Sequence, residues 1–175
     1  MRILTSPDPL LRQVCKPVEV GDARIKRLVR QMLKEMYKAD GVGLAAPQVG
    51  ELIQLVIIDT EYDSEATYDP YVLINPVIVE QSETKVPFSE GCLSIPGVSC
   101  EIYRPDRVVV EAYNLDADLM RYTAEGDLFC VCLQHEIDHL HGVTMFERLD
   151  PRDRVHALRA YQDALARGAQ PGDTD

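Results

Sequence analysis

Three parts of the chain carry apolar residues at helical spacing. The first begins after Asp22, a residue suited to an N-cap, and the last follows Asp150-Pro151, where proline fits the first helical position. The second runs from about 124 to 141 and ends before Gly142, a residue suited to a helix C-terminus. We therefore predict three helices. The apolar faces of the first and last are Ile25, Leu28, Val29, Met32, Leu33, Met36 and Tyr37, and Val155, Leu158, Tyr161 and Leu165.

The stretch between the first two helices has the pattern of extended strands. Residues 52–59 form a strongly apolar run with β-branched residues, and Asn75-Pro76 places a bend within 71–80. Further extended segments are predicted at 86–95, 98–103, 107–113 and 146–149, with a hairpin or strand connection at 114–121 and an acidic surface loop at 62–70. This order indicates an α+β fold, with mainly antiparallel sheets packed around a central helix and with an N-terminal and a C-terminal helix.

The length of the chain favours one folded unit. Its 175 residues suit a single domain with one substantial core. Neither an internal repeat nor a linker divides the sequence, so we predict one catalytic domain over 1–167. Residues 168–175 are polar, and we predict a frayed tail there.

Charge and cysteine usage narrow the class of partner. The formal net charge of −11 argues against nucleic acid or an anionic membrane as the main partner, because both select a basic surface. No apolar run approaches the ~20 residues of a membrane span. Five cysteines, without the apolar core of a signal peptide near the start, lead us to expect a reducing cytoplasm.

The candidate chemistry begins with an H-E-x-x-H motif in the second helix. His135 and His139 are four residues apart, so they lie on one face of a helix and can bind the same metal ion. Glu136 lies beside them, where it can take a proton from water. Two histidines leave such a site one protein ligand short of the usual catalytic set.

Two other segments admit both a chemical and a structural interpretation. Cys92, within 90–97, would complete a Cys-His-His set as a thiolate, but a free cysteine is more often a buried apolar residue. The segment 41–50 is rich in glycine and alanine. It is either a helix-to-strand connection or a loop whose backbone approaches a ligand closely. Spacing alone decides neither case.

Three segments taken together resemble the signature motifs of the peptide deformylases. They occur in the order Gly43-Leu44-Ala45-Ala46-Pro47-Gln48, Glu90-Gly91-Cys92-Leu93-Ser94 and Gln134-His135-Glu136-Ile137-Asp138-His139-Leu140. The resemblance covers roughly residues 3–150. It implies an enzyme that removes the formyl group from the N-terminal formyl-methionine of newly made proteins.

The resemblance also implies the metal centre. Cys92, His135 and His139 would bind one divalent ion, with Fe(II) expected and Zn(II), Ni(II) or Co(II) able to replace it. Glu136 would be the catalytic acid and base.

It further assigns the oxyanion hole and the setting of Cys92. Gln48, through its side-chain amide, and Leu93, through its backbone N–H, would stabilise the oxyanion. Glu90 and Gly91 would present Cys92 correctly.

The substrate would be an extended N-terminus, for which pairing with a strand edge is expected. The segment Val42-Gly43-Leu44 is a candidate edge. By resemblance, Val42, Val131, Cys132 and His135 line an apolar slot for the methionine side chain, although helix packing alone would also explain Val131 and Cys132. The expected partners are formyl-methionyl N-termini of nascent peptides at the ribosome, with no direct sequence-specific nucleic-acid binding and no membrane binding.

Two rival functions stay open on the sequence. One is a metalloprotease that uses the same helix motif, and the other is a structural metal site or an inactive peptide-binding relative. Cys92 and Gln48 argue against the protease, and the intact pair of Glu136 and Gln48 argues against inactivity. We also predict that Asp138 pairs with Arg104 and ties the motif helix to the sheet, with a role beside a metal-binding histidine as the alternative.

Overall fold

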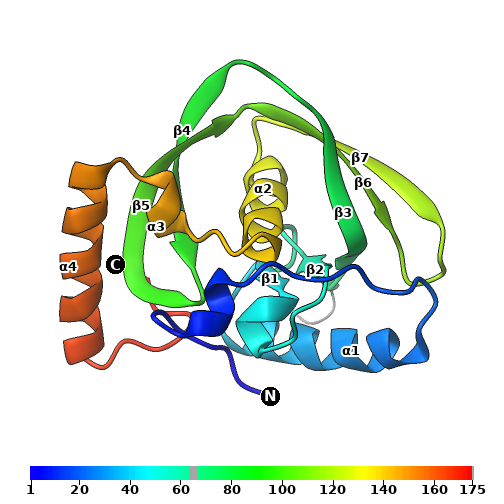
Figure 1. The fold of residues 1–175 in the computed structure, drawn as a ribbon, viewed down its shortest axis with the longest axis horizontal. Helices are drawn as coiled ribbons and strands as arrows, with labels where there is room; N and C mark the ends of the chain where they lie inside the picture. Colours follow the sequence, from blue (N-terminus) through cyan, green and yellow to red (C-terminus); the bar gives the residue numbers. More distant parts are fainter. Residues whose placement is uncertain (64–66, 175) are drawn as a thin grey trace.

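In the computed structural model, which describes residues 1–63 and 67–174, two antiparallel sheets surround one central helix (Figure 1). Strands β4 (Lys85–Cys92) and β5 (Ile95–Pro105) pair separately from a five-stranded sheet. The order of that sheet is β1 (Gly43–Ala45), β2 (Leu55–Ile58), β3 (Tyr71–Gln81), β6 (Arg107–Tyr113) and β7 (Leu119–Glu125). The other elements are the 3-10 helices η1 (Pro9–Arg12) and η2 (Ala46–Val49) and the α-helices α1 (Ala23–Lys38), α2 (Leu128–Leu140), α3 (Met145–Arg148) and α4 (Pro151–Ala166). The predicted α+β class is confirmed.

Helix α2 is the central helix. Every residue from Cys130 to Leu140 is buried, so beyond its first two residues this helix has no face turned to water. Its apolar side chains, such as Leu133 and Ile137, pack on Val56 and Val110 of the five-stranded sheet. A helix buried all round must give each of its polar side chains a partner or a function. Across the described part of the chain, no helix combines the length and apolarity that a membrane crossing requires.

Helix α1 covers the opposite face of strands β1 to β3. The predicted N-cap is confirmed, since Asp22 Oδ1 accepts a hydrogen bond of 2.9 Å from the Arg24 N–H. The buried residues of α1 pack on Leu44, Leu55 and Ile57, whereas Val56 faces α2. This alternation along β2 explains why 52–59 has no polar face, because helices cover both sides of the strand.

Strand β1 lies at the edge of its sheet, next to β2 only. The Asp59 N–H donates to the Val42 carbonyl at 2.8 Å, so the backbone groups of Val42 face β2. Those of Gly43, one residue further, face the other way. The free edge of β1 is therefore available to an extended peptide.

Two predicted element boundaries are wrong around the helices. Strand β7 continues to Glu125, and α2 begins only at Leu128, because Gly126 has φ +67° and Asp127 caps the Cys130 N–H. Residues 146–149, predicted to be extended, fall largely in α3, which Thr144 caps.

The strands confirm one predicted bend and shorten one predicted strand. The bend at Asn75-Pro76 is confirmed as an irregularity inside β3, with Asn75 at φ +52°. The turn of the β4–β5 hairpin falls at 93–94, so the strand predicted over 86–95 ends at Cys92. Of the predicted loop over 62–70, residues 64–66 lie outside the described part of the chain.

Helix α4 packs against β5 through a different face from the predicted one. Tyr161 is buried as predicted, but the other buried residues are Ala157 and Ala164, which contact the cluster around Val98. Val155, Leu158 and Leu165 are 47%, 38% and 40% exposed. Alanine side chains let α4 approach β5 closely. The prediction from hydrophobicity selected the larger side chains and so missed this face.

Candidate metal centre

Cys92, His135 and His139 come together at the centre of the fold. Their ligand atoms all lie within 4.8 Å of one another. The two histidines are one turn apart on α2, with ring centroids separated by 5.0 Å, and Cys92 Sγ lies 3.3 Å from His139 Nε2. The pairing of β4 with β5 thus brings a cysteine distant in sequence to the motif helix.

These donors fit a divalent metal ion. One thiol and two imidazoles are a catalytic type of ligand set, which leaves a further position for water or substrate. Burial, with the neighbouring His135 charge, lowers the pKa of His139 to about 3, so its ring is neutral, as a metal ligand must be. Glu136 Oε2 and His139 Nδ1 are the buried side-chain polar atoms that have no hydrogen-bond partner among the described residues.

Glu90 orients one of the two histidines. His135 Nδ1 lies 2.9 Å from Glu90 Oε2, which leaves Nε2 to face Cys92. Burial alone would raise the pKa of Glu90, but hydrogen bonds from His135 and Arg104 outweigh it and lower the pKa. An ionised carboxylate behind a histidine fixes the ring and raises its basicity toward a metal.

A chain of buried charges extends from Glu90. Arg104, only 3% exposed, donates to both oxygens of Glu90, and its Nη1 donates to Asp138 Oδ2 at 2.9 Å. Arg148 also donates to both oxygens of Asp138. The predicted contact between Asp138 and Arg104 is confirmed, and it ties α2 to β5.

The sequence interpretation missed the contact between Glu90 and His135 and the contribution of Arg148. The sequence did contain a signal that Arg104 is buried. It continues the alternating inward positions of Val98, Cys100 and Ile102 along β5. A charged residue in such an alternation indicates a buried ionic partner.

Glu136 is enclosed beside the three donors. It is 5% exposed, and burial raises its pKa to about 7. Gly43 of β1 lies directly against it, since a Cβ on Gly43 would stand 2.5 Å from Glu136 Oε1. The close approach of backbone suggested for the glycine-rich segment is therefore present, and it faces a candidate catalytic group.

We predict that Gly43→Ala lowers kcat/KM by about 10²-fold, because the new methyl group displaces the Glu136 carboxylate by about 1 Å. The fold should persist, since the nearest atoms belong to the end of a side chain. Steady-state kinetics with thermal unfolding checks this. Wild-type kcat/KM in the variant would show that the carboxylate keeps its place.

Gln48 is held in one orientation beside Cys92. Its Oε1 accepts a hydrogen bond of 2.8 Å from the Ala45 N–H. This turns Nε2 toward Ser94 Oγ at 3.1 Å and Cys92 Sγ at 3.7 Å. Leu93 follows Cys92 at the hairpin turn and lines the cleft into which the cluster opens. The amide donor of Gln48 and the backbone of Leu93 therefore both lie next to the donor cluster.

The cluster opens into a cleft of about 220 Å³. The predicted substrate residues Val42, Gly43, Gly91, Val131 and Cys132 all line it. Leu44 does not, because its side chain is fully buried against α1. Phe88 and Leu128 also line the cleft, and sequence reasoning missed both. The inward alternation of β4 was a signal for Phe88.

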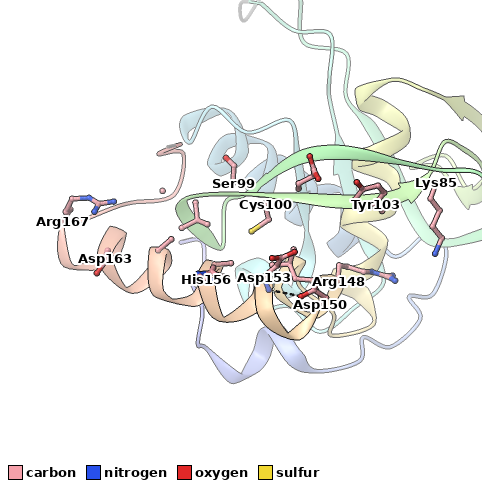
Figure 2. Close-up of a pocket in the computed structure, with 16 residues that line it drawn as sticks. Lys85, Ser99, Cys100, Tyr103, Arg148, Asp150, Asp153, His156, Asp163 and Arg167 are labelled. Carbon is pink, nitrogen blue, oxygen red and sulfur yellow. Dashed lines mark hydrogen bonds between the residues drawn. The ribbon is translucent and has the colours of Figure 1, made fainter.

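A larger cavity of about 1020 Å³ lies between β5 and α4. Figure 2 shows its polar lining, which includes Lys85, Tyr103, Asp153, His156 and Arg167. None of the residues predicted to bind metal or substrate contributes to it. The candidate chemistry therefore belongs to the smaller cleft.

Comparisons with known proteins agree on one family. The family model described as Polypeptide deformylase matches residues 1–155. A peptide deformylase of Mesorhizobium japonicum is 43% identical over 170 residues, which are 97% of this chain and 95% of that protein. The crystal structure of a peptide deformylase from Legionella pneumophila has a TM-score of 0.87 at 38% identity, covering 95% of this chain and 96% of that one. One from Synechococcus elongatus, in complex with actinonin, has a TM-score of 0.83 at 40% identity, covering 91% and 85%.

Proposed function

Because this chain belongs to the peptide deformylase family, we propose that it hydrolyses the N-formyl group of formyl-methionine at the start of newly made proteins and releases formate. Family membership makes the chain an enzyme, a hydrolase. The observation that carries the specific proposal is the cluster of Cys92, His135 and His139 beside the buried carboxylate of Glu136. Cys92, His135 and Glu136 line one cleft.

The three clustered side chains would hold one divalent ion, and we propose Fe(II), with Zn(II), Ni(II) or Co(II) able to replace it. When bound, such an ion makes water acidic enough to yield a nucleophile at neutral pH and polarises a carbonyl group. The soft thiolate of Cys92 favours a transition metal over Mg²⁺ or Ca²⁺. It also leaves the site sensitive to oxidation.

Glu136 would move the protons of the reaction. Its carboxylate takes a proton from the attacking water and later delivers it to the amine that leaves as the C–N bond of the formamide breaks. A pKa of about 7 suits both transfers, because neither the uptake nor the release of the proton is strongly unfavourable at neutral pH. The products are formate and a free methionyl N-terminus.

Gln48 and Leu93 would stabilise the oxyanion of the tetrahedral intermediate. The Gln48 amide donates from Nε2, and the hydrogen bond from Ala45 to Oε1 prevents the amide from turning over. The Leu93 backbone N–H would supply a second donor. Such donors act strongly because their orientation is fixed before the reaction begins.

We predict that Gln48→Leu lowers kcat by about 10²–10³-fold, since one oxyanion donor is lost while the side chain keeps a similar volume. KM should change little, because the ground-state carbonyl gains much less from this donor. Steady-state kinetics on a formyl-methionyl tripeptide measures both constants. A variant that loses affinity at unchanged kcat would place Gln48 in ground-state binding instead.

The peptide would bind as an added strand. The outward backbone groups of Gly43 offer one edge, with Val42 beside it, and Leu44 anchors this strand in the core. Gly91 lies on the β4 side of the cleft.

The methionine side chain would occupy the apolar part of the cleft. Val131 and Cys132 line it with Phe88 and Leu128, next to His135. We further propose that the substrates are nascent chains at the ribosome in the cytoplasm, and that residues 1–167 form the catalytic domain.

Anaerobic purification with metal analysis, followed by an assay of formate and free amine, tests the proposal. We expect formate from a formyl-methionyl tripeptide in a one-to-one ratio with new amine, and no cleavage of internal peptide bonds. The acetyl-methionyl tripeptide is the matched control and should release no acetate. Internal cleavage would favour the metalloprotease alternative, and the absence of turnover in metal-loaded protein would favour an inactive relative.

A further inference from the structure

Residues 168–174, which the sequence predicts to fray, lie against the cleft in the structure. Gly172, Asp173 and Thr174 line the same cleft as Cys92 and Glu136. In Figure 1 the chain leaves the lower end of α4 and turns back toward the centre of the molecule. We name residues 168–174 the C-terminal segment.

The C-terminal segment contains a well-defined turn. The Asp173 N–H donates to the Gln170 carbonyl at 2.9 Å, and Asp173 Oδ2 accepts the Gln170 N–H at 2.7 Å. Pro171 occupies the second position of this turn and Gly172, at φ +103°, the third. This is the residue order of a type II turn, in which proline fixes one dihedral and glycine adopts the left-handed one without strain.

The turn is packed against both sides of the cleft. A Cβ on Gly172 would stand 2.5 Å from the carbonyl oxygen of Ala39, which precedes the strand β1. On the other side, the Gly97 N–H of β5 donates to the Asp173 carbonyl at 2.9 Å. The segment thus lies between the chain that leads from α1 into β1 and the hairpin that carries Cys92.

The rim that includes this turn is acidic. Asp40 and Asp173 are both exposed, and no lysine or arginine occurs among the described residues that line the cleft. The lining at Phe88, Leu128 and Val131 is apolar and suits methionine. Whatever follows the methionine must leave the cleft past its rim.

We propose that the C-terminal segment is a specificity-determining wall of the cleft, at which Asp173 favours basic over acidic residues after the formyl-methionine. The proposal rests on the proposed deformylase function and deepens it. The Asp173 carboxylate is exposed, so water and salt screen its interaction with a charged peptide residue. The expected effect on substrate preference is therefore moderate and depends on salt.

The test compares kcat/KM for formyl-Met-Lys-Ser and formyl-Met-Glu-Ser peptides. In wild-type protein the lysine peptide should be preferred, and Asp173→Asn should reduce that preference by about threefold at low salt. The matched control is Glu83→Gln, which removes one exposed charge from the connection between β3 and β4, outside the cleft. This control should keep the wild-type preference.

A second variant tests the wall independently of charge. Gly172→Val cannot keep both the left-handed φ and the contact with Ala39, so the turn must move. We expect KM to rise for both tripeptides more than for formyl-methionine amide, which has no residue beyond the methionine.

The proposal is overturned if Asp173→Asn changes the preference no more than Glu83→Gln, or if Gly172→Val affects the amide and the tripeptides equally. Failure of the deformylase function has a different result, because wild-type protein would then release formate from none of these compounds.

Discussion

Glu136→Gln is expected to lower kcat for formate release by about 10²–10⁴-fold, the usual contribution of a general acid and base. The amide keeps the size of the side chain but cannot take a proton from water. Because the ligand cluster consists of Cys92, His135 and His139, the variant should still bind metal in the wild-type amount.

The burial of Glu136 is the reason to expect a large loss of kcat in this variant. Its side chain extends from α2 and is buried against Gly43, and its pKa is raised to about 7 by burial. Within the described residues, no other carboxylate in the cleft is both buried and without a cationic partner, since Glu90 is paired with Arg104.

Metal analysis together with kinetics checks the Glu136 prediction. Glu125→Gln, at the exposed end of β7, is the matched control and should keep wild-type kcat and metal content. If Glu136→Gln retained more than a tenth of kcat, another group would have to carry the proton. If it lost its metal, the residue would act in binding the ion rather than in proton transfer.

Arg104→Met is expected to destabilise the fold by about 3–5 kcal/mol, the cost of leaving buried charges without their partner. Arg104 lies between the carboxylates of Glu90 and Asp138 with almost no exposure to water. Methionine fills a similar volume but donates no hydrogen bond. Metal affinity should also fall by about 10–100-fold, because Glu90 would no longer be held against His135.

Urea denaturation of the metal-free protein, followed by metal titration, measures the two effects separately. Arg107→Met is the matched control, because Arg107 is only half-buried and its partner Glu80, at 3.6 Å, lies on the surface. That variant should lose about 1 kcal/mol or less. Equal losses in the two arginine variants would contradict a special role of the buried charges.

The same buried charges give the stability a defined pH dependence. For Asp138, burial raises the pKa, but the hydrogen bond from Arg148 and the charge of Arg104 outweigh it, so the folded pKa is lowered. Against the effect of burial, the folded pKa of Glu90 is also lowered, by its hydrogen bonds with His135 and Arg104. Unfolded carboxyl groups titrate near pH 4. The stabilisation is therefore present above about pH 4 and is lost below it, and Arg104→Met should show a shallower loss.

The helix motif shows how far sequence reasoning reaches. His135 and His139 lie on one face of α2 as the helical period requires, and Glu136 lines the cleft together with His135. The role of Cys92 stayed open on spacing alone, and only the resemblance to a family favoured it as a ligand. Its proximity to the histidines depends on the register of β4 against β5, which sequence spacing does not encode.

Predictions of packing were less complete, for identifiable reasons. The apolar face predicted for α4 assumed that large side chains are buried, whereas Ala157 and Ala164 make the close contact with β5. Leu44 was predicted as part of the peptide-binding edge, and strand alternation turns its side chain into the core beneath α1, so it does not line the cleft. Both outcomes depend on which neighbour lies opposite a residue.

The sequence by itself determined the α+β order of elements and the metal-binding pattern of α2, because both follow from local periodicity. Only the tertiary structure decided that Glu90 supports His135, that Arg104 also binds Glu90, and that residues 168–174 border the cleft. These contacts join residues far apart in the chain. They form because burying a charge or a backbone polar group requires a partner, and the fold determines which partner is near.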